Sequence, residues 1–145
     1  MSFAVSPPRI GLAMIVRNES AVIARCLRSV ASLIDCWTIV DTGSTDGTQQ
    51  SIREYMKDIP GQLIERPWVD FAHNRSEAIQ AAAGTADYLL FMDADDTLEC
   101  PKGPSLPELS ADAYQIEITH KSLAYKRNAL VKEALQWRYE GVLHE

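Results

Sequence analysis

Apolar runs of strand length alternate with segments of helical periodicity over the first two thirds of the chain. A run that is apolar at nearly every position is typical of a strand covered on both faces, whereas apolar residues three or four positions apart form one helix face. Strands are predicted at residues 9–16, 36–40, 62–65 and 87–92. Helices are predicted between them, the second ending near Lys57.

Polar residues and glycine mark the expected helix ends. Asn18 and Asp70 are predicted N-caps, because their side-chain oxygens can accept hydrogen bonds from the first helical amides. Asp46 or Ser44 can cap the second helix, and Gly84 lies where a glycine commonly ends one. Three strand–helix units followed by a strand predict an α/β fold, a Rossmann-like sheet with a parallel centre and helices on both faces.

The pattern changes after residue 100. Residues 101–107 hold three of the seven prolines and are expected to be a loop. Residues 114–119 alternate like a half-exposed strand, and residues 122–131 are its candidate partner. The chain is predicted to be one domain over residues 1–145, truncated at its C-terminus because no helix or cap closes it.

The composition agrees with one soluble globular domain. The 145 residues are 46% hydrophobic and 23% charged. No apolar run reaches the length of a transmembrane segment, and the first residues do not form a secretory signal. The three cysteines are scattered singly, which favours reduced thiols. We therefore expect a cytoplasmic protein, or one peripheral at the inner face of the membrane.

The net charge of −6 restricts the ligands. An acidic domain offers no broad basic surface for nucleic acid or anionic lipid, so no nucleic-acid partner is expected. An anionic ligand would need local neutralisation, for which a bound cation is the obvious candidate.

The strongest chemical signal is the segment Phe91-Met-Asp-Ala-Asp-Asp96, in which an apolar strand ends in three carboxylates. Ligands of an open parallel sheet bind at the carboxyl ends of its strands. Clustered carboxylates repel one another, and a hard cation such as Mg²⁺ or Mn²⁺ would relieve that repulsion. The alternative is a polar turn with a helix cap.

A second signal is the loop Asp41-Thr-Gly-Ser-Thr-Asp-Gly-Thr48 after the second strand. Asp41 can accept a hydrogen bond from a ribose hydroxyl or a base N–H. The loop lacks the lysine of a phosphate-binding P-loop, so that motif is excluded. The alternative is again a turn with a helix cap.

A third signal is the segment Asp70-Phe-Ala-His-Asn-Arg75. The guanidinium of Arg75 suits a phosphate or a base edge. The alternative for Arg75 is a structural ion pair with Asp93 or Asp95.

Taken in this order, the motifs resemble the family 2 nucleotide-sugar glycosyltransferases, which have the GT-A fold. The resemblance rests on Arg17-Asn-Glu19, the 40–48 run, Asn74-Arg75, the acidic motif and Trp137-Arg-Tyr-Glu-Gly-Val-Leu-His-Glu145. One departure is Thr42, where many members carry a second Asp.

The resemblance implies transfer of a sugar from a nucleoside-diphosphate sugar to a hydroxyl of a saccharide, lipid or protein acceptor, with inversion and with Mn²⁺ or Mg²⁺. Residues 1–100 would bind the donor, and residues 101–145 would form part of the acceptor side. The implied nucleotide-sugar-binding residues are Arg17, Asn18, Glu19, Asp41, Arg75, Asp93 and Ala94. The implied metal ligands are Asp95 and His144, and the implied catalytic base is Glu145.

Two other functions stay open at this point. Residues 93–97 also match the DxDxT motif of haloacid-dehalogenase-like phosphotransferases, although three strand–helix units precede it and no later acidic pair follows. The chain could also bind a nucleotide sugar without transferring it. Because the implied base lies at the chain end, we expect donor binding with poor transfer by these 145 residues, and Asp96 is the next candidate for the base.

Overall fold

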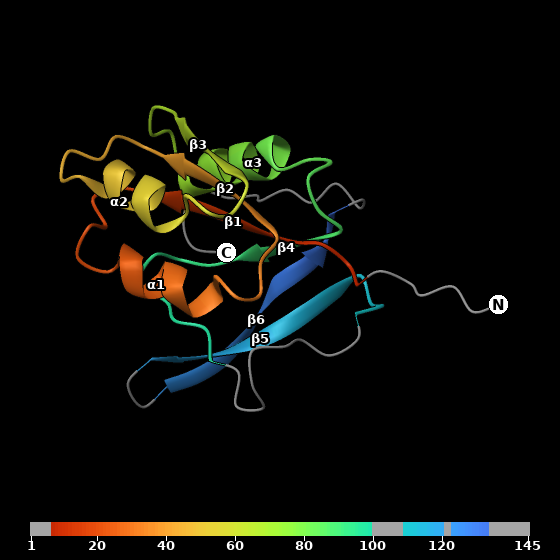
Figure 1. The fold of residues 1–145 in the computed structure, drawn as a ribbon. Helices are drawn as coiled ribbons and strands as arrows, with labels where there is room; N and C mark the ends of the chain where they lie inside the picture. The colour runs from red at the N-terminus through yellow and green to blue at the C-terminus, as the bar shows by residue number, and fades with distance from the viewer. Residues whose placement is uncertain (1–6, 100–108, 121–122, 134–145) are drawn as a thin grey trace.

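The computed structural model describes residues 7–99, 109–120 and 123–133 (Figure 1). The predicted order of strands and helices is confirmed there, with boundaries that differ by one or two residues except at the start of the first helix. The elements are β1 (Ile10–Val16), α1 (Ile23–Val30), β2 (Cys36–Asp41), α2 (Thr48–Tyr55), β3 (Gly61–Glu65), α3 (Phe71–Ala81), β4 (Tyr88–Phe91), β5 (Ala113–His120) and β6 (Leu123–Lys132).

These strands form a six-stranded sheet in the order β3-β2-β1-β4-β6-β5. The four strands from β3 to β4 are parallel, and β1 lies between β2 and β4. The last two strands are antiparallel: β6 pairs with β4, and β5 pairs with β6. The predicted parallel centre and the predicted strand pair after the loop are both confirmed.

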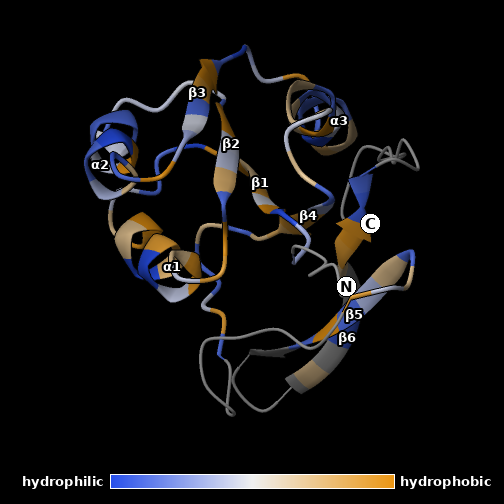
Figure 2. Cartoon of the chain, turned by 45° about the vertical axis from the view of Figure 1, so that its right-hand side comes forward, coloured by the Kyte–Doolittle hydropathy of each residue, from blue (hydrophilic) through white to orange (hydrophobic). Residues whose placement is uncertain are grey.

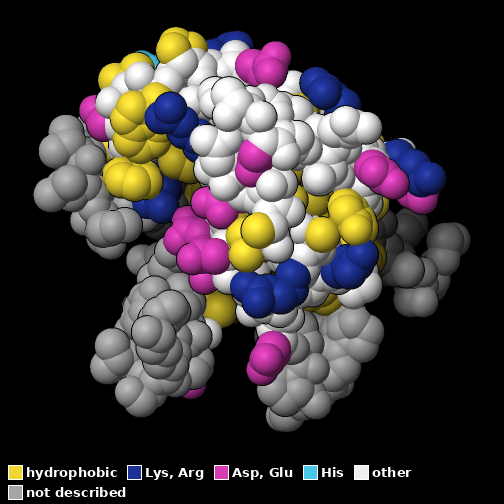
Figure 3. Space-filling model, turned by 90° about the vertical axis from the view of Figure 1, so that its left-hand side faces the viewer, with side chains coloured by type: hydrophobic (Ala, Val, Ile, Leu, Met, Phe, Trp, Pro, Cys, Tyr) yellow, Lys and Arg dark blue, Asp and Glu magenta, His cyan; other side chains and the backbone are white. Residues whose placement is uncertain are grey.

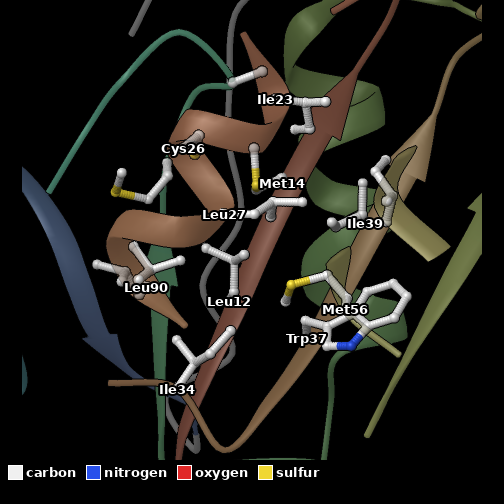
Figure 4. Packing of buried hydrophobic residues seen from close by; sticks show 14 of the residues in the cluster. Leu12, Met14, Ile23, Cys26, Leu27, Ile34, Trp37, Ile39, Met56 and Leu90 are labelled. Carbon is white, nitrogen blue, oxygen red and sulfur yellow. The ribbon is translucent and has the colours of Figure 1, made fainter. Parts of the chain in front are cut away.

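Helices cover both faces of the parallel strands, with α1 and α2 on one side and α3 on the other (Figures 1 and 2). On the first side, Leu12 and Met14 of β1 and Ile39 of β2 pack with Ile23 and Leu27 of α1 (Figure 4). A smaller cluster joins α3 to β4 and β6 through Ile79, Ala82, Leu89 and Val131. Ile10, Leu12, Met14 and Val16 of β1 all belong to the first cluster, and Ala13 between them is also buried. Cover by helices on both faces explains the continuous apolar run of this strand.

The cap prediction is confirmed for α3 and wrong for α1, whereas at α2 the predicted Asp46 accepts from the first helical amide, that of Thr48, although Gly47 occupies the N-cap position. Asp70 caps α3, because its Oδ1 accepts a hydrogen bond from the amide of His73 at 2.7 Å. Asn18 does not cap α1, which begins at Ile23 without a side-chain cap. Instead Asn18 has a φ of +52°, a left-handed conformation that asparagine tolerates, and its side chain bonds another loop. Gly47, with a φ of +89°, occupies the N-cap position of α2.

Gly61 makes a close approach that constrains the sheet edge. It is paired with Trp37 across β2 and β3, and a methyl group at Gly61 would lie 2.2 Å from ring atoms of Trp37. The indole cannot move freely, because it is 7% exposed and its Nε1 donates to the carbonyl of Ile59 at 2.8 Å.

We expect Gly61→Ala to lower the free energy of unfolding by about 1–3 kcal/mol, a typical cost of overpacking. Urea unfolding measures the effect. In a Trp37→Leu background the same change should cost much less, because the clashing ring is gone. Equal costs in both backgrounds would contradict the contact.

Candidate functional site

The carboxyl ends of β1, β2 and β4 and the start of α3 surround a cavity of about 380 Å³. Figure 3 shows this edge of the molecule, where acidic side chains gather beside hydrophobic ones. The cavity is lined by Ile15, Val16, Arg17, Glu19, Thr42, Trp68, Phe71, Arg75, Asp93, Ala94 and Asp95.

Six of the residues implied by the resemblance line this cavity: Arg17, Glu19, Arg75, Asp93, Ala94 and Asp95. Asp41 and Asn18 are not in the lining, although Thr42, next to Asp41, is. His144 and Glu145 lie outside the described residues, so their predicted roles stay predictions.

The acidic motif forms a compact cluster directly after β4. Asp93, Asp95 and Asp96 each offer a carboxylate oxygen, and these oxygens lie within 4.8 Å of one another. The amide of Asp96 donates to the carbonyl of Asp93 at 3.0 Å, so the motif turns back on itself. The donor set is all oxygen, which suits Mg²⁺ or Mn²⁺.

Helix α1 fastens the main chain of this acidic loop. Arg25 Nη2 donates to the carbonyl of Asp95 at 3.2 Å, and Cys26 Sγ donates to that of Asp93 at 3.5 Å. Ser29 Oγ accepts from the amide of Leu98 at 3.0 Å. Burial, and then the nearby carboxylates, raise the pKa of Cys26 to about 12, so its thiol stays protonated and remains a donor. These three hydrogen bonds involve main-chain groups of the acidic loop and none of its carboxylate oxygens. The sequence analysis did not predict them.

Arg75 reaches the cluster from α3. Its Nη2 lies 3.1 Å from Asp93 Oδ1, and its guanidinium carbon lies 5.3 Å from the centre of the Phe71 ring. The ion-pair interpretation of Arg75 is therefore confirmed. The side chain also lines the cavity, so its positive charge faces any anion bound there.

Asp41 is fully buried at the end of β2. Its Oδ1 accepts from the amides of Gly43 and Ser44 at 2.9 and 2.8 Å and from Gln49 Nε2 at 3.3 Å. Its Oδ2 is also buried, yet it has no hydrogen-bond partner among the described residues. A buried acceptor without a partner is costly, so Oδ2 fits a ligand that donates an N–H or O–H.

The loops after β1 and β2 are tied together by hydrogen bonds. Asn18 takes part twice: its amide donates to Ser44 Oγ at 2.8 Å, and its Oδ1 accepts from the amide of Thr45 at 2.8 Å. The amide of Glu19 donates to Thr48 Oγ1 at 2.9 Å. The structure thus gives Asn18 a loop-fixing role where the sequence predicted a helix cap.

The Glu19 carboxyl group is placed in a negative environment. Burial is the main cause of its raised pKa, and the charges of Asp95, Asp46 and Asp93 raise it further. A cation at the cluster would counter this repulsion.

Asp46 holds the same two loops through its ionised form. Its Oδ1 accepts from the amide of Thr48 and its Oδ2 from the amide of Ser20, both at 3.1 Å. Hydrogen bonds from the Thr48 and Ser20 side chains and amides hold the pKa of Asp46 well below its usual range. The folded state therefore binds this proton more weakly than the unfolded chain does, so the stabilisation is complete above the unfolded pKa and is lost as pH falls.

We expect Asp46→Ala to lower the Tm at pH 7, and the difference from the wild type to shrink as pH drops below about 4. Thermal unfolding followed by circular dichroism over pH 2–7 measures both effects. Glu54→Ala, an exposed carboxylate of α2, serves as the control. A difference independent of pH would contradict the role of the ionised carboxylate.

Two aromatic residues of the lining were missed by the sequence analysis. Trp68 and Phe71 meet edge to face, with ring centres 4.9 Å apart. The available signal was a tryptophan in the loop between the third strand and the Asp70 cap, a place where an apolar side chain has no strand or helix face to join.

Within the described residues, none of the helices has the length and apolar character needed to cross a membrane.

The fold belongs to a known class of transferase. The chain is a member of glycosyl transferase family 2, whose model matches residues 12–109. The resemblance stated from the motifs is thereby confirmed. The match also disfavours the phosphotransferase alternative, whose motif would have to follow a first strand rather than β4.

Curated relatives resemble part of the chain. A TPR repeat-containing protein of Synechococcus elongatus is 38% identical over 91 residues, covering 62% of this chain and 21% of the relative. The lipopolysaccharide core biosynthesis glycosyltransferase LpsC of Rhizobium meliloti is 30% identical over 104 residues, covering 71% of this chain and 37% of LpsC. The chain thus spans well under half the length of these relatives.

Several solved structures share the fold. A mannosyltransferase from Pyrobaculum calidifontis, solved with GDP-Man and Mn²⁺, matches with a TM-score of 0.57 at 23% identity, covering 66% of this chain and 30% of that one. TarS of S. aureus, solved with UDP-GlcNAc, matches with a TM-score of 0.54 at 23% identity, covering 61% of this chain and 27% of that one. The expected GT-A fold is confirmed.

Proposed function

We propose that this protein binds a nucleoside-diphosphate sugar at the carboxyl ends of β1, β2 and β4 and takes part in transferring the sugar to an acceptor hydroxyl. The observation that carries the proposal is the three-carboxylate cluster, of which Asp93 and Asp95 line the same cavity as Arg75. A diphosphate is anionic, and a divalent cation on the cluster together with Arg75 would neutralise it.

The proposed roles follow the positions of the side chains. Asp41 Oδ2 would accept a hydrogen bond from the nucleoside, while Arg17, Glu19 and Arg75 would surround the diphosphate. Asp95 is the proposed metal ligand, because its carboxylate is the exposed one of the cluster. When bound, Mn²⁺ or Mg²⁺ would stabilise the negative charge of the departing diphosphate as a Lewis acid.

The acceptor side of the proposal concerns the end of the chain. Inversion requires a carboxylate base on the acceptor hydroxyl, opposite the leaving group. Glu145 is the proposed base and His144 a proposed second metal ligand, both from the family resemblance. The proposed acceptor is a hydroxyl of a saccharide, a lipid or a protein.

A second candidate function is donor binding without transfer. It is favoured by one observation, that the chain spans 21% to 37% of the length of the curated relatives described above. In that case the 145 residues supply the donor site and another segment supplies the acceptor site.

Calorimetry of UDP and GDP binding with Mn²⁺ tests the shared part of both proposals. We expect one of the two nucleotides to bind with Mn²⁺ and to lose its affinity when a chelator is added. Product formation from a labelled UDP- or GDP-sugar then separates transfer from binding. Absence of metal-dependent binding by either nucleotide would refute the donor site.

A further inference from the structure

The segment between β3 and α3 brings an exposed tryptophan to the donor cavity. It starts against Asp41, because the amide of Arg66 donates to the Asp41 carbonyl at 2.9 Å. Two residues later, Trp68 lines the cavity and is still 41% exposed. Its ring packs in a T-shaped, edge-to-face arrangement with the ring of Phe71, which also lines the cavity.

The buried side-chain amide of Asn74 is hydrogen-bonded to the main chain on both sides of Trp68. Asn74 of α3 is fully buried, and its Oδ1 accepts from the amide of Val69 at 2.9 Å. Its Nδ2 donates to the carbonyl of Pro67 at 3.1 Å and to Glu77 Oε1 at 2.8 Å. The two main-chain groups belong to the residues on either side of Trp68, so Asn74 fixes the backbone from which the indole projects.

The cavity is divided between apolar and charged surfaces. Ile15, Val16, Trp68 and Phe71 supply its apolar part, and Arg17, Glu19, Asp93 and Asp95 supply charges. Of the parts of a nucleoside-diphosphate sugar, the diphosphate requires the charges and the cation. The flat heterocycle is the part that gains most from an aromatic face.

We propose that Trp68 provides the face on which the nucleobase of the donor stacks, and that Asn74 is the positioning residue that keeps the indole there. The inference rests on the proposed nucleotide-sugar site and adds two residues to it. Stacking on Trp68 leaves the base edge available for Asp41 Oδ2. Because every base has an aromatic face, this contact serves UDP and GDP alike.

Binding to Trp68 variants tests the stacking contact. Trp68→Ala should weaken UDP or GDP binding with Mn²⁺ by about 10-fold or more, whereas Trp68→Phe should retain most of the affinity. Pyrophosphate with Mn²⁺ should bind equally to both variants and the wild type, because it has no base. Tyr55→Ala is the matched control, since Tyr55 is an aromatic residue of α2 that is 42% exposed and does not line the cavity.

Tryptophan fluorescence gives a second readout. The experiment uses a Trp137→Phe background, in which Trp37 and Trp68 are the two remaining tryptophans. The nucleotide should quench the emission of this protein, and adding Trp68→Phe should abolish that quenching while Trp37, which is 7% exposed, continues to emit. Persistent quenching in Trp68→Phe, or nucleotide affinity of Trp68→Ala within twofold of the wild type, would overturn the proposal. Weaker binding of a UDP-sugar but not of UDP would assign Trp68 to the sugar and also overturn it.

A double-mutant cycle tests the positioning role of Asn74. Asn74→Ala should weaken nucleotide binding in the wild-type background and have little further effect in Trp68→Ala, while pyrophosphate binding stays unchanged. Equal losses in both backgrounds would contradict positioning through Trp68. If the wild type binds pyrophosphate with Mn²⁺ but neither nucleotide, the proposed function and this inference both fail; if it binds a nucleotide that Trp68→Ala binds equally well, only this inference fails.

Discussion

Asp95→Ala is expected to weaken Mn²⁺-dependent nucleotide binding by 10-fold or more. The substitution removes the exposed carboxylate of the cluster, and its two neighbours are already engaged. Asp93 is paired with Arg75 at 3.1 Å, and Asp96 Oδ2 accepts from the amide of Asp93 at 3.3 Å. Loss of one interaction in a metal site typically costs about 10–100-fold in affinity.

Calorimetry with and without chelator measures this effect. The main chain of Asp95 remains bonded to Arg25 in the variant, so the loop should keep its position. Asp58→Ala removes an exposed carboxylate beyond the end of α2 and should bind nucleotide and Mn²⁺ as the wild type does. An unchanged affinity in Asp95→Ala would show that Asp95 does not ligate the metal.

Asp41→Asn is the second substitution with a large expected effect. It preserves the shape of the side chain and an oxygen at Oδ1 for the amides of Gly43 and Ser44. At the Oδ2 position it replaces a charged acceptor by an NH₂ donor. A nucleoside N–H or O–H would then face another donor, and the loss of a hydrogen bond to a charged group corresponds to about 10–100-fold in affinity.

The control for Asp41→Asn lies at the other end of the parallel sheet. Asp35 precedes β2 and its Oδ2 accepts from the amide of Ile10 at 2.8 Å, far along the strand from the cavity. Asp35→Asn should leave nucleotide affinity unchanged. If Asp41→Asn also binds nucleotide as the wild type does, while unfolding at the same temperature, then Oδ2 does not contact the donor.

Much of the fold could be predicted from the sequence because its information is local. The mainly apolar runs of β1 and β2 indicate strands that are buried on both faces. The cap of α3 was predictable because Asp70 lies only three positions before His73, whose amide it accepts from. The acidic cluster was also predictable, since it directly follows a strand and the carboxyl ends of parallel strands share one edge.

The remaining features depend on contacts between distant segments. Asn18 resembles a helix cap in sequence, but its partners Ser44 and Thr45 come from the next loop, and no pattern near Asn18 indicates them. In the sequence, Asn74 stands out only as part of the family motif with Arg75. Its bonds to Pro67 and Val69 become visible only when α3 and the preceding loop are seen together.

The anchoring of the acidic loop to α1 has a consequence for the choice of ion. Because Arg25, Cys26 and Ser29 hold the main chain before any ligand arrives, the loop gives up little conformational entropy when it binds a cation. Differences in affinity between ions then do not arise from differences in how well each ion orders the loop. Discrimination between Mg²⁺, Mn²⁺ and Ca²⁺ would depend on ionic radius, preferred coordination number and ease of dehydration, measured against carboxylates whose spacing is already set.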